Sequence, residues 1–299
     1  MQRLLKMTLA GLFALLALPT SAAPAMWEVS DADSKVVLFG SFHILPENTE
    51  WRTPAFDAAL AQSKLVYFET DIGPLGMIAL TIKMVGLAFE QRPSWTGRLW
   101  PSQLELLTDA IKPIGMSLQE ADLFPPWVTT LRLSMSPAID PAGEGDGTGP
   151  SKPAYGDGVD SSLQWELPKE RKGYLETATQ QYEVLAAGSI EKQINDLMQL
   201  LRTGRDTAAK TDGLDTLLAA WQAGDVDAIA AMFEASEGND PADLDRLLYD
   251  RNANWIPTIE SLLADNEQDL IVVGAAHLAG ERSVLDLLQQ AGYTVTRIQ

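Results

Sequence analysis

Two segments near opposite ends of the 299-residue chain share one pattern, an uninterrupted apolar run followed by Gly-x-x-His. The first run starts at Val36 and leads to His43, and the second starts at Leu270 and leads to His277. Apolar runs of this length, rich in β-branched residues, are typical of strands buried on both faces of a parallel sheet. Any fold of this chain must therefore bring together two buried strands that lie almost a whole chain length apart.

His43 and His277 are also the only histidines of the chain. Each lies just past the end of its predicted strand, after a glycine that lets the backbone turn sharply. Open α/β sheets place their ligand crevices at this edge. A single histidine there is more often a turn or core residue with a satisfied hydrogen bond. Because the repeated pattern uses both histidines, we predict that they share one site.

The first strand–helix–strand unit carries a carboxylate as well as a histidine. The strand that ends at Gly40 is followed by a helix that begins at Thr53-Pro54, and then by the strand Leu65–Phe68, which leads into Glu69. Parallel strands that are linked by a helix and lie next to each other end at the same edge of the sheet. We therefore expect Glu69 to lie beside His43.

The rest of the chain reads mainly as helices between two β/α regions. Apolar periodicity predicts helices over most of 75–135 and again over 178–264, with a short strand leading into Glu176. Residues 136–153 are rich in Gly, Pro and Asp and predict a flexible insertion. The chain closes with the second apolar run, a helix and a terminal strand at 293–296. The sequence thus predicts an α/β fold, with a central sheet built from both chain ends and wrapped by many helices, and a helical middle region.

Residues 1–23 have the composition of a secretory signal peptide. Arg3 and Lys6 precede a short apolar stretch, and small residues follow it at Ser21-Ala22-Ala23. An uncleaved anchor helix is the alternative, but the stretch is too short to span a bilayer. We expect residues 24–299 to form a single exported domain, in the periplasm or outside the cell, with no later membrane span.

The absence of cysteine limits the chemistry that the chain can use. Without cysteine there are no disulfides, no thiolate metal ligands and no cysteine nucleophile, so a metal would be held by nitrogen and oxygen. The formal net charge of −19 disfavours nucleic acids and anionic membranes as partners, because both are negatively charged. The sequence also contains no G-x-S-x-G motif, phosphate-binding loop or dinucleotide fingerprint.

Two imidazoles and one carboxylate form a common open metal site that leaves positions for water and substrate. We predict His43 and His277 as nitrogen donors and Glu69 as the oxygen donor, because a charge at the end of a buried strand needs a partner. Pairing of Glu69 with a backbone amide or an arginine is the alternative. A divalent ion held in this way activates water for hydrolysis. The donors suit Mn, Co, Zn or Fe and do not choose among them.

Two more charged residues are candidates for the same chemistry. Glu176 could serve as a general base or an additional ligand, and Arg251 could stabilise developing negative charge. The plainer interpretations are that Glu176 caps the helix that follows it and that Arg251 is a solvated cation on a helix. With Glu69, these two residues complete the predicted catalytic set.

Taken in order, these motifs resemble the TraB/PrgY/GumN family, to which the Tiki membrane-tethered metalloproteases are similar. The resemblance runs from about Trp27 to Gln299 and rests on G-S-F-H ending at His43, F-E-T-D containing Glu69, Y-G-D-G-V-D ending at Asp160, L-E-T containing Glu176, Arg251-Asn252 and G-A-A-H ending at His277. The family's two Gly-x-x-His motifs and its acidic residue correspond to His43, His277 and Glu69. The insertion at 136–153 and the lack of a membrane anchor in the mature chain are departures from the Tiki pattern.

By this resemblance the fold is an α/β sheet wrapped by helices, more distantly similar to erythromycin esterase and the haem-binding ChaN proteins, and Tiki relatives are divalent-metal-dependent proteases. We therefore predict an exported metal-dependent hydrolase, with a peptidase favoured, that acts on a peptide or protein substrate. An esterase is a second kind of hydrolase to consider. The alternative from a different class is a non-catalytic protein that binds and sequesters a peptide signal or haem.

Overall fold

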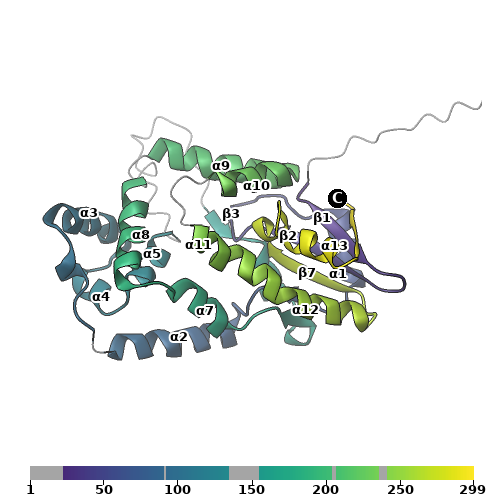
Figure 1. Cartoon of the computed structure of the whole chain (residues 1–299), viewed down its shortest axis with the longest axis horizontal. Helices are drawn as coiled ribbons and strands as arrows, with labels where there is room; N and C mark the ends of the chain where they lie inside the picture. The colour runs from purple at the N-terminus through teal and green to yellow at the C-terminus, as the bar shows by residue number, and fades with distance from the viewer. Residues whose placement is uncertain (1–22, 91, 135–154, 204–206, 236–240) are drawn as a thin grey trace, which may run out of the picture.

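Strands from both ends of the chain form one six-stranded mixed sheet in the computed structural model (Figure 1). The structure describes residues 23–90, 92–134, 155–203, 207–235 and 241–299. The strand order is β6-β4-β7-β2-β1-β8, in which β1 pairs antiparallel with β2 and β8, and the other neighbours are parallel. The fold class predicted from the sequence is therefore confirmed.

The strands are short and close to their predicted positions. The large sheet consists of β1 (Met26–Ser30), β2 (Lys35–Ser41), β4 (Val66–Phe68), β6 (Lys172–Tyr174), β7 (Asp269–Gly274) and β8 (Thr294–Arg297). A second sheet pairs β3 (Ile44–Pro46) with β5 (Tyr155–Asp157) in antiparallel orientation. Neither β3 nor β5 was predicted from the sequence, because each has only three residues and β3 ends in proline. The short strand expected to lead directly into Glu176 ends earlier, at Tyr174.

The helices occupy the predicted regions. They are α1 (Pro54–Gln62), α2 (Pro74–Phe89), α3 (Pro101–Ile111), α4 (Leu118–Asp122), α5 (Pro126–Ser134), α6 (Val159–Glu166), α7 (Ala178–Ala186), α8 (Ile190–Thr203), α9 (Thr207–Ala223), α10 (Val226–Glu234), α11 (Pro241–Leu244), α12 (Asp250–Ala264) and α13 (Val284–Gln290). A π-helical turn at Asp245–Tyr249 joins α11 to α12, and 3₁₀ turns of the described residues lie at Thr96–Arg98, Lys112–Ile114, Lys169–Arg171 and Ala275–Leu278. Among the described residues, no helix is long and apolar enough to cross a membrane.

The two repeated apolar runs lie side by side at the centre of the sheet. Val36–Ser41 of β2 pairs in parallel with Asp269–Gly274 of β7, and Val66–Phe68 of β4 pairs with the other side of β7. The expectation that β2 and β4 are neighbours is therefore wrong, because β7 lies between them. The consequence drawn from it still holds, since all three strands are parallel and end at the same edge.

The central strands are buried on both faces, as their composition predicts. Phe39 and Val272 pack on one face with residues of α1, α6, α9 and α10. Leu38 and Ile271 pack on the other face with residues of α12 and α13. Each of these four side chains is completely buried. Burial of this kind contributes about 1.5–3 kcal/mol per large apolar side chain and fixes the register of the strands.

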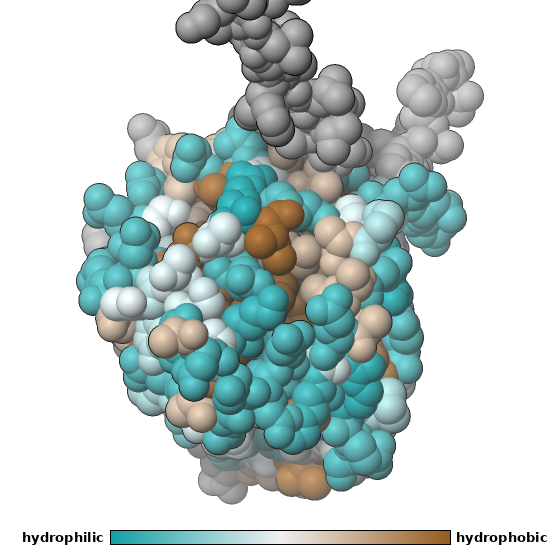
Figure 2. All heavy atoms as spheres, turned by 90° about the vertical axis from the view of Figure 1, so that its right-hand side faces the viewer, coloured by the Kyte–Doolittle hydropathy of each residue, from teal (hydrophilic) through white to brown (hydrophobic). Residues whose placement is uncertain are grey.

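The helical middle region forms its own apolar cluster beside the sheet, on the left of Figure 1. Leu107 of α3, Leu133 of α5 and Leu197 of α8 are buried together there. The opposite end of the molecule presents mostly hydrophilic side chains, with several apolar ones gathered near the centre of the face (Figure 2). The predicted signal peptide, apart from Ala23, and the predicted insertion at 136–153 lie outside the described residues, so both stay predictions.

Candidate functional site

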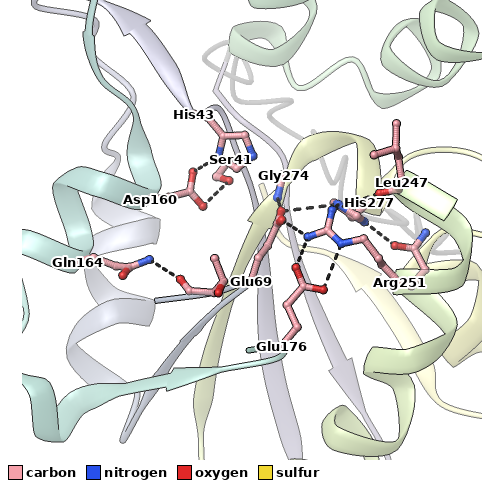
Figure 3. Close-up of polar contacts among 12 residues, drawn as sticks. Ser41, His43, Glu69, Asp160, Gln164, Glu176, Leu247, Arg251, Gly274 and His277 are labelled. Atoms are coloured by element: carbon pink, nitrogen blue, oxygen red, sulfur yellow. Dashed lines mark hydrogen bonds and ion pairs between the residues drawn. The ribbon is translucent and has the colours of Figure 1, made fainter. Parts of the chain in front are cut away.

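The carboxyl ends of the three parallel strands β2, β7 and β4 carry the predicted site (Figure 3). His43 follows β2, Glu69 follows β4, and His277 lies in the 3₁₀ turn that follows β7. Glu69 and His277 are buried, whereas 62% of the His43 side chain is exposed. The site is therefore closed towards the sheet and open to solvent on the side of His43.

Gly274, the last residue of β7, marks the point where the three side chains meet. A Cβ atom added to Gly274 would lie 3.2 Å from Glu69 Oε1, 3.5 Å from His43 Nε2 and 3.6 Å from His277 Cδ2. The backbone nitrogen of Gly274 also donates a hydrogen bond of 2.8 Å to Glu69 Oε1. The structure thus brings together the two histidines and the glutamate that were singled out in the sequence, around a space that only glycine leaves free.

Asn252 of α12 fixes the orientation of the His277 ring. The Asn252 side chain donates through Nδ2 to the Arg282 carbonyl at 2.9 Å, so its Oδ1 faces His277 Nδ1 at 2.6 Å. Because Oδ1 can only accept, Nδ1 must carry the hydrogen, and the lone pair of a neutral ring then lies on Nε2. Burial lowers the pKa of His277 to about 4, so the ring is neutral at ordinary pH.

Asp160 of α6 fixes the His43 ring in the corresponding way. Its Oδ2 lies 2.9 Å from His43 Nδ1, and its Oδ1 accepts a 2.9 Å hydrogen bond from the Ser41 hydroxyl. The negative charge of Asp160 holds the pKa of His43 above its usual range, and solvent weakens this interaction because the ring is exposed. With Nδ1 directed at Asp160, Nε2 is the nitrogen that faces Glu69 and Gly274.

Glu69 and Glu176 are neighbours because the ends of β4 and β6 are paired. The Glu176 backbone nitrogen donates to the Glu69 carbonyl at 2.9 Å, which continues the pairing of the two strands by one step. Both side chains are buried, and two carboxylates this close to each other require a cation. The pairing of β4 with β6 therefore places two negative charges side by side, and Arg251 supplies the positive charge that balances them.

Arg251 of α12 binds both carboxylates. Its Nη2 lies 2.5 Å from Glu69 Oε2 and 2.6 Å from Glu176 Oε1, and its Nε donates to Glu176 Oε2 at 3.1 Å. Burial alone would raise the pKa of Glu69, but the positive charges of Arg251 and His43 and the hydrogen bond from the Gly274 backbone hold that pKa well below its usual range. Neither plainer interpretation applies, since the Arg251 side chain is only 11% exposed and is paired with both glutamates, and Thr177, not Glu176, caps α7.

The two imidazoles and the carboxylate are donors that suit a metal held by nitrogen and oxygen. Each imidazole is also hydrogen-bonded through Nδ1 to a second side chain, Asp160 or Asn252, as is usual for histidines that bind metals. His277 Nε2 and Glu69 Oε1 are 3.6 Å apart, and Arg251 Nη1 donates to the same Nε2 at 3.1 Å. In the part of the chain that the structure describes, no three His, Asp or Glu side chains are grouped closely enough to hold a metal ion as they stand. The orientation of the two rings and the types of donor atom therefore suit a divalent metal ion, and the binding of such an ion is a proposal.

Asp160 and Asn252 were present in the sequence motifs but had no role assigned to them. Their acceptor function depends on contacts across 117 and 25 residues of sequence, which spacing does not reveal. Ser41 was set aside as a nucleophile, and the structure places its hydroxyl on Asp160 instead. Trp255, one turn after Arg251, was also missed; its ring centroid lies 4.5 Å from that of His277.

Gly158 allows α6 to start directly against the backbone at His43. Its nitrogen donates to the His43 carbonyl at 3.1 Å, and a Cβ atom there would lie 2.1 Å from the Phe42 carbonyl oxygen. We expect Gly158→Ala to push the start of α6 outward and to lower the free energy of unfolding by about 1–3 kcal/mol, as overpacking does. Urea denaturation measures this loss.

Gly156→Ala is the matched control, because its Cβ would meet only the Glu47 side chain at 3.8 Å. Equal stability of the two alanine variants would contradict the close approach at Gly158.

Fold and site together define an α/β protein with two oriented histidines and a buried charged cluster at the carboxyl edge of its sheet. Residues 25–297 match the TraB/PrgY/gumN family, and the chain belongs to this family. The chain is also similar to a protein named metalloprotease TIKI homolog from Amphimedon queenslandica, with 42% identity over 55 residues. That match covers 18% of this chain and 11% of the relative. No solved structure matches the chain significantly.

Proposed function

We propose that the protein is an exported metal-dependent hydrolase, most simply a peptidase, that acts on peptides or proteins. One observation carries the proposal: His43 Nε2, Glu69 Oε1 and the ring of His277 surround one point at Gly274. Both imidazoles have their Nδ1 atoms engaged by other side chains, so Nε2 is the donor atom that each ring offers to the site. In His277 this atom accepts from Arg251 Nη1 at 3.1 Å, and an ion bound there would take the place of that hydrogen bond. Such a set of two imidazoles and a carboxylate, open on one side, is the arrangement of a hydrolytic metal centre.

His43, Glu69 and His277 would hold the ion, which would supply a polarised carbonyl and a water of lowered pKa. Asp160 and Asn252 keep the two rings in the orientation that directs Nε2 towards Glu69. The polar groups of the site are buried and held at fixed positions, so they need little reorganisation when charge develops on a bound substrate. This favours electrostatic stabilisation of the transition state.

Glu176 and Arg251 are the remaining members of the proposed catalytic set. Glu176 is buried at the same edge of the sheet and carries the carboxylate that we assign as general base. Arg251 contacts Glu69, Glu176 and His277 at once, so its guanidinium is placed to stabilise negative charge that develops on a bound carbonyl. The similarity to a protein named as a metalloprotease supports this assignment, although it covers a small part of that relative.

The proposal predicts that Glu176→Gln abolishes turnover and leaves the protein folded. We expect a loss of about 10²–10⁴-fold in kcat, the usual contribution of a general base. Peptide and casein cleavage after loading with Mn, Co or Zn measures the effect, and circular dichroism checks the fold. Glu183→Gln, an exposed glutamate on α7, is the matched control and should keep full activity.

Two results would argue against a hydrolase. If Glu176→Gln turns over substrate at the parent rate, Glu176 has no catalytic role. If the metal-loaded parent binds peptides or haem in a stable complex and cleaves nothing, the protein is better described as a sequestering protein.

A further inference from the structure

One face of α2 carries a row of large apolar side chains that no described part of the chain covers. Ile78, Ile82, Val85 and Phe89 have exposed fractions of 56%, 67%, 51% and 84%. Single exposed apolar residues are normal on protein surfaces, but a contiguous row of them on one helix indicates a binding surface. The helix begins at Pro74, shortly after Glu69 and the carboxyl end of β4, and runs along the lower left of the view in Figure 1.

The opposite face of α2 attaches the helix to the protein. Leu87 is buried together with Trp127 of α5, and Lys83 lies with its Nζ 4.5 Å from the centroid of the Tyr182 ring in α7. Leu87 follows Ile78 by nine residues, which is two and a half turns, so the two side chains point in opposite directions. The apolar row therefore faces outward because the helix is held from its other side.

The spacing of the row fits another helix better than it fits a lipid surface. The four positions are separated by four, three and four residues, which is the repeat of a coiled-coil seam and gives a narrow stripe. Helices that lie in a membrane interface carry a wider apolar face and several Lys or Arg residues. From 74 to 89 the chain has a single basic residue, Lys83, and it contacts Tyr182.

A second copy of the same helix complements this row. Antiparallel pairing about a two-fold axis places Ile82 against Val85 and Ile78 against Phe89, so that larger and smaller side chains alternate across the seam. Although the chain has a net charge of −19, residues 74–89 contain no Asp or Glu, so no negative charges face each other there. Glu90 would approach the first turn of the partner's helix, where the helix dipole favours a carboxylate.

We infer that this row is the interface at which two copies of the chain pair α2 against α2 in antiparallel orientation. The inference is independent of the proposed hydrolase function, because it rests on side chains of α2 that are not among the residues proposed for the site. One helix pair buries less area than the roughly 1,600 Å² of a standard interface. We therefore expect a dimer that dissociates at about micromolar concentration.

Sedimentation velocity over a concentration series tests the dimer. The parent protein should shift from monomer to dimer as its concentration rises, and Ile82→Glu with Val85→Glu should remain monomeric throughout. Trp100→Glu is the matched control, because Trp100 is 74% exposed outside α2 and should not affect pairing. A parent that is monomeric throughout, or a dimer that survives the double substitution, would overturn the inference.

Disulfide formation tests the orientation, since the chain contains no cysteine of its own. A mixture of Ile82→Cys and Val85→Cys proteins should form the mixed disulfide much faster than either protein alone forms a disulfide with itself. The reverse result would mean parallel pairing and would contradict the proposed interface. Co-sedimentation of a monomeric parent with phosphatidylcholine vesicles, lost in the double glutamate variant, would also overturn the inference and assign the row to a lipid surface.

Discussion

His277→Ala is expected to remove a bound divalent ion that the parent protein holds at close to one equivalent. His277 is buried beside Glu69, and its ring is oriented by Asn252, so no neighbouring nitrogen can replace Nε2. The chain offers only one other imidazole, His43, on a different strand end. Elemental analysis after chelator-free purification and reloading with Mn, Co or Zn measures the occupancy.

His43→Ala should produce the same loss, although the two histidines are contributed by strands from opposite ends of the chain. Loss in both variants, with secondary structure intact by circular dichroism, would indicate one shared site. Gln289→Ala, an exposed change on α13, serves as the control and should retain the ion. A parent that binds no metal under any loading condition would remove the basis of the metallohydrolase proposal.

The sequence was sufficient to predict which strands carry the candidate site, because strands buried on both faces consist almost entirely of apolar residues and are easy to recognise. The runs that lead to Gly40 and Gly274 are almost entirely apolar, and their parallel pairing brings His43 and His277 to one edge. Glu69 was selected because it follows another such strand, where a carboxylate is costly unless a partner balances its charge. Strand order was harder, because no local feature shows that β7 lies between β2 and β4.

The partners of the site residues depend on the packing of distant elements and could not be predicted. Glu176 lies beside Glu69 only because β6 pairs with β4, and nothing in either segment encodes that pairing. Asp160 reaches His43 because Gly158 lets α6 approach the backbone there. An apolar helix from Met77 to Phe89 was predicted, but which face of α2 is exposed depends on the side that contacts α5 and α7.

Arg251→Met is expected to cause the largest loss of stability of any single substitution at the site. It would leave Glu69 and Glu176 buried at the same sheet edge without the guanidinium that pairs with both. Removing one partner of a buried ion pair typically costs about 3–5 kcal/mol, because the remaining charge is uncompensated. Urea denaturation at neutral pH in the presence of a chelator measures this loss without compensation by a metal.

Arg98→Met is the matched control, since Arg98 pairs with Glu191 at the surface, where an ion pair contributes about 0–1 kcal/mol. The pH dependence gives a second test. The depressed pKa of Glu69 contributes stability above the ordinary glutamate value of 4.5, and the parent loses this contribution as the pH falls further. In Arg251→Met the unpaired Glu69 carboxylate has a pKa raised above 4.5 by burial, so protonation relieves it already above that pH. The difference in unfolding free energy should therefore narrow as the pH falls from neutral, and narrow further below pH 4.5 as the parent loses its own contribution. A difference that is small at neutral pH, or that does not change in acid, would mean that Arg251 is not the cation that balances the two glutamates.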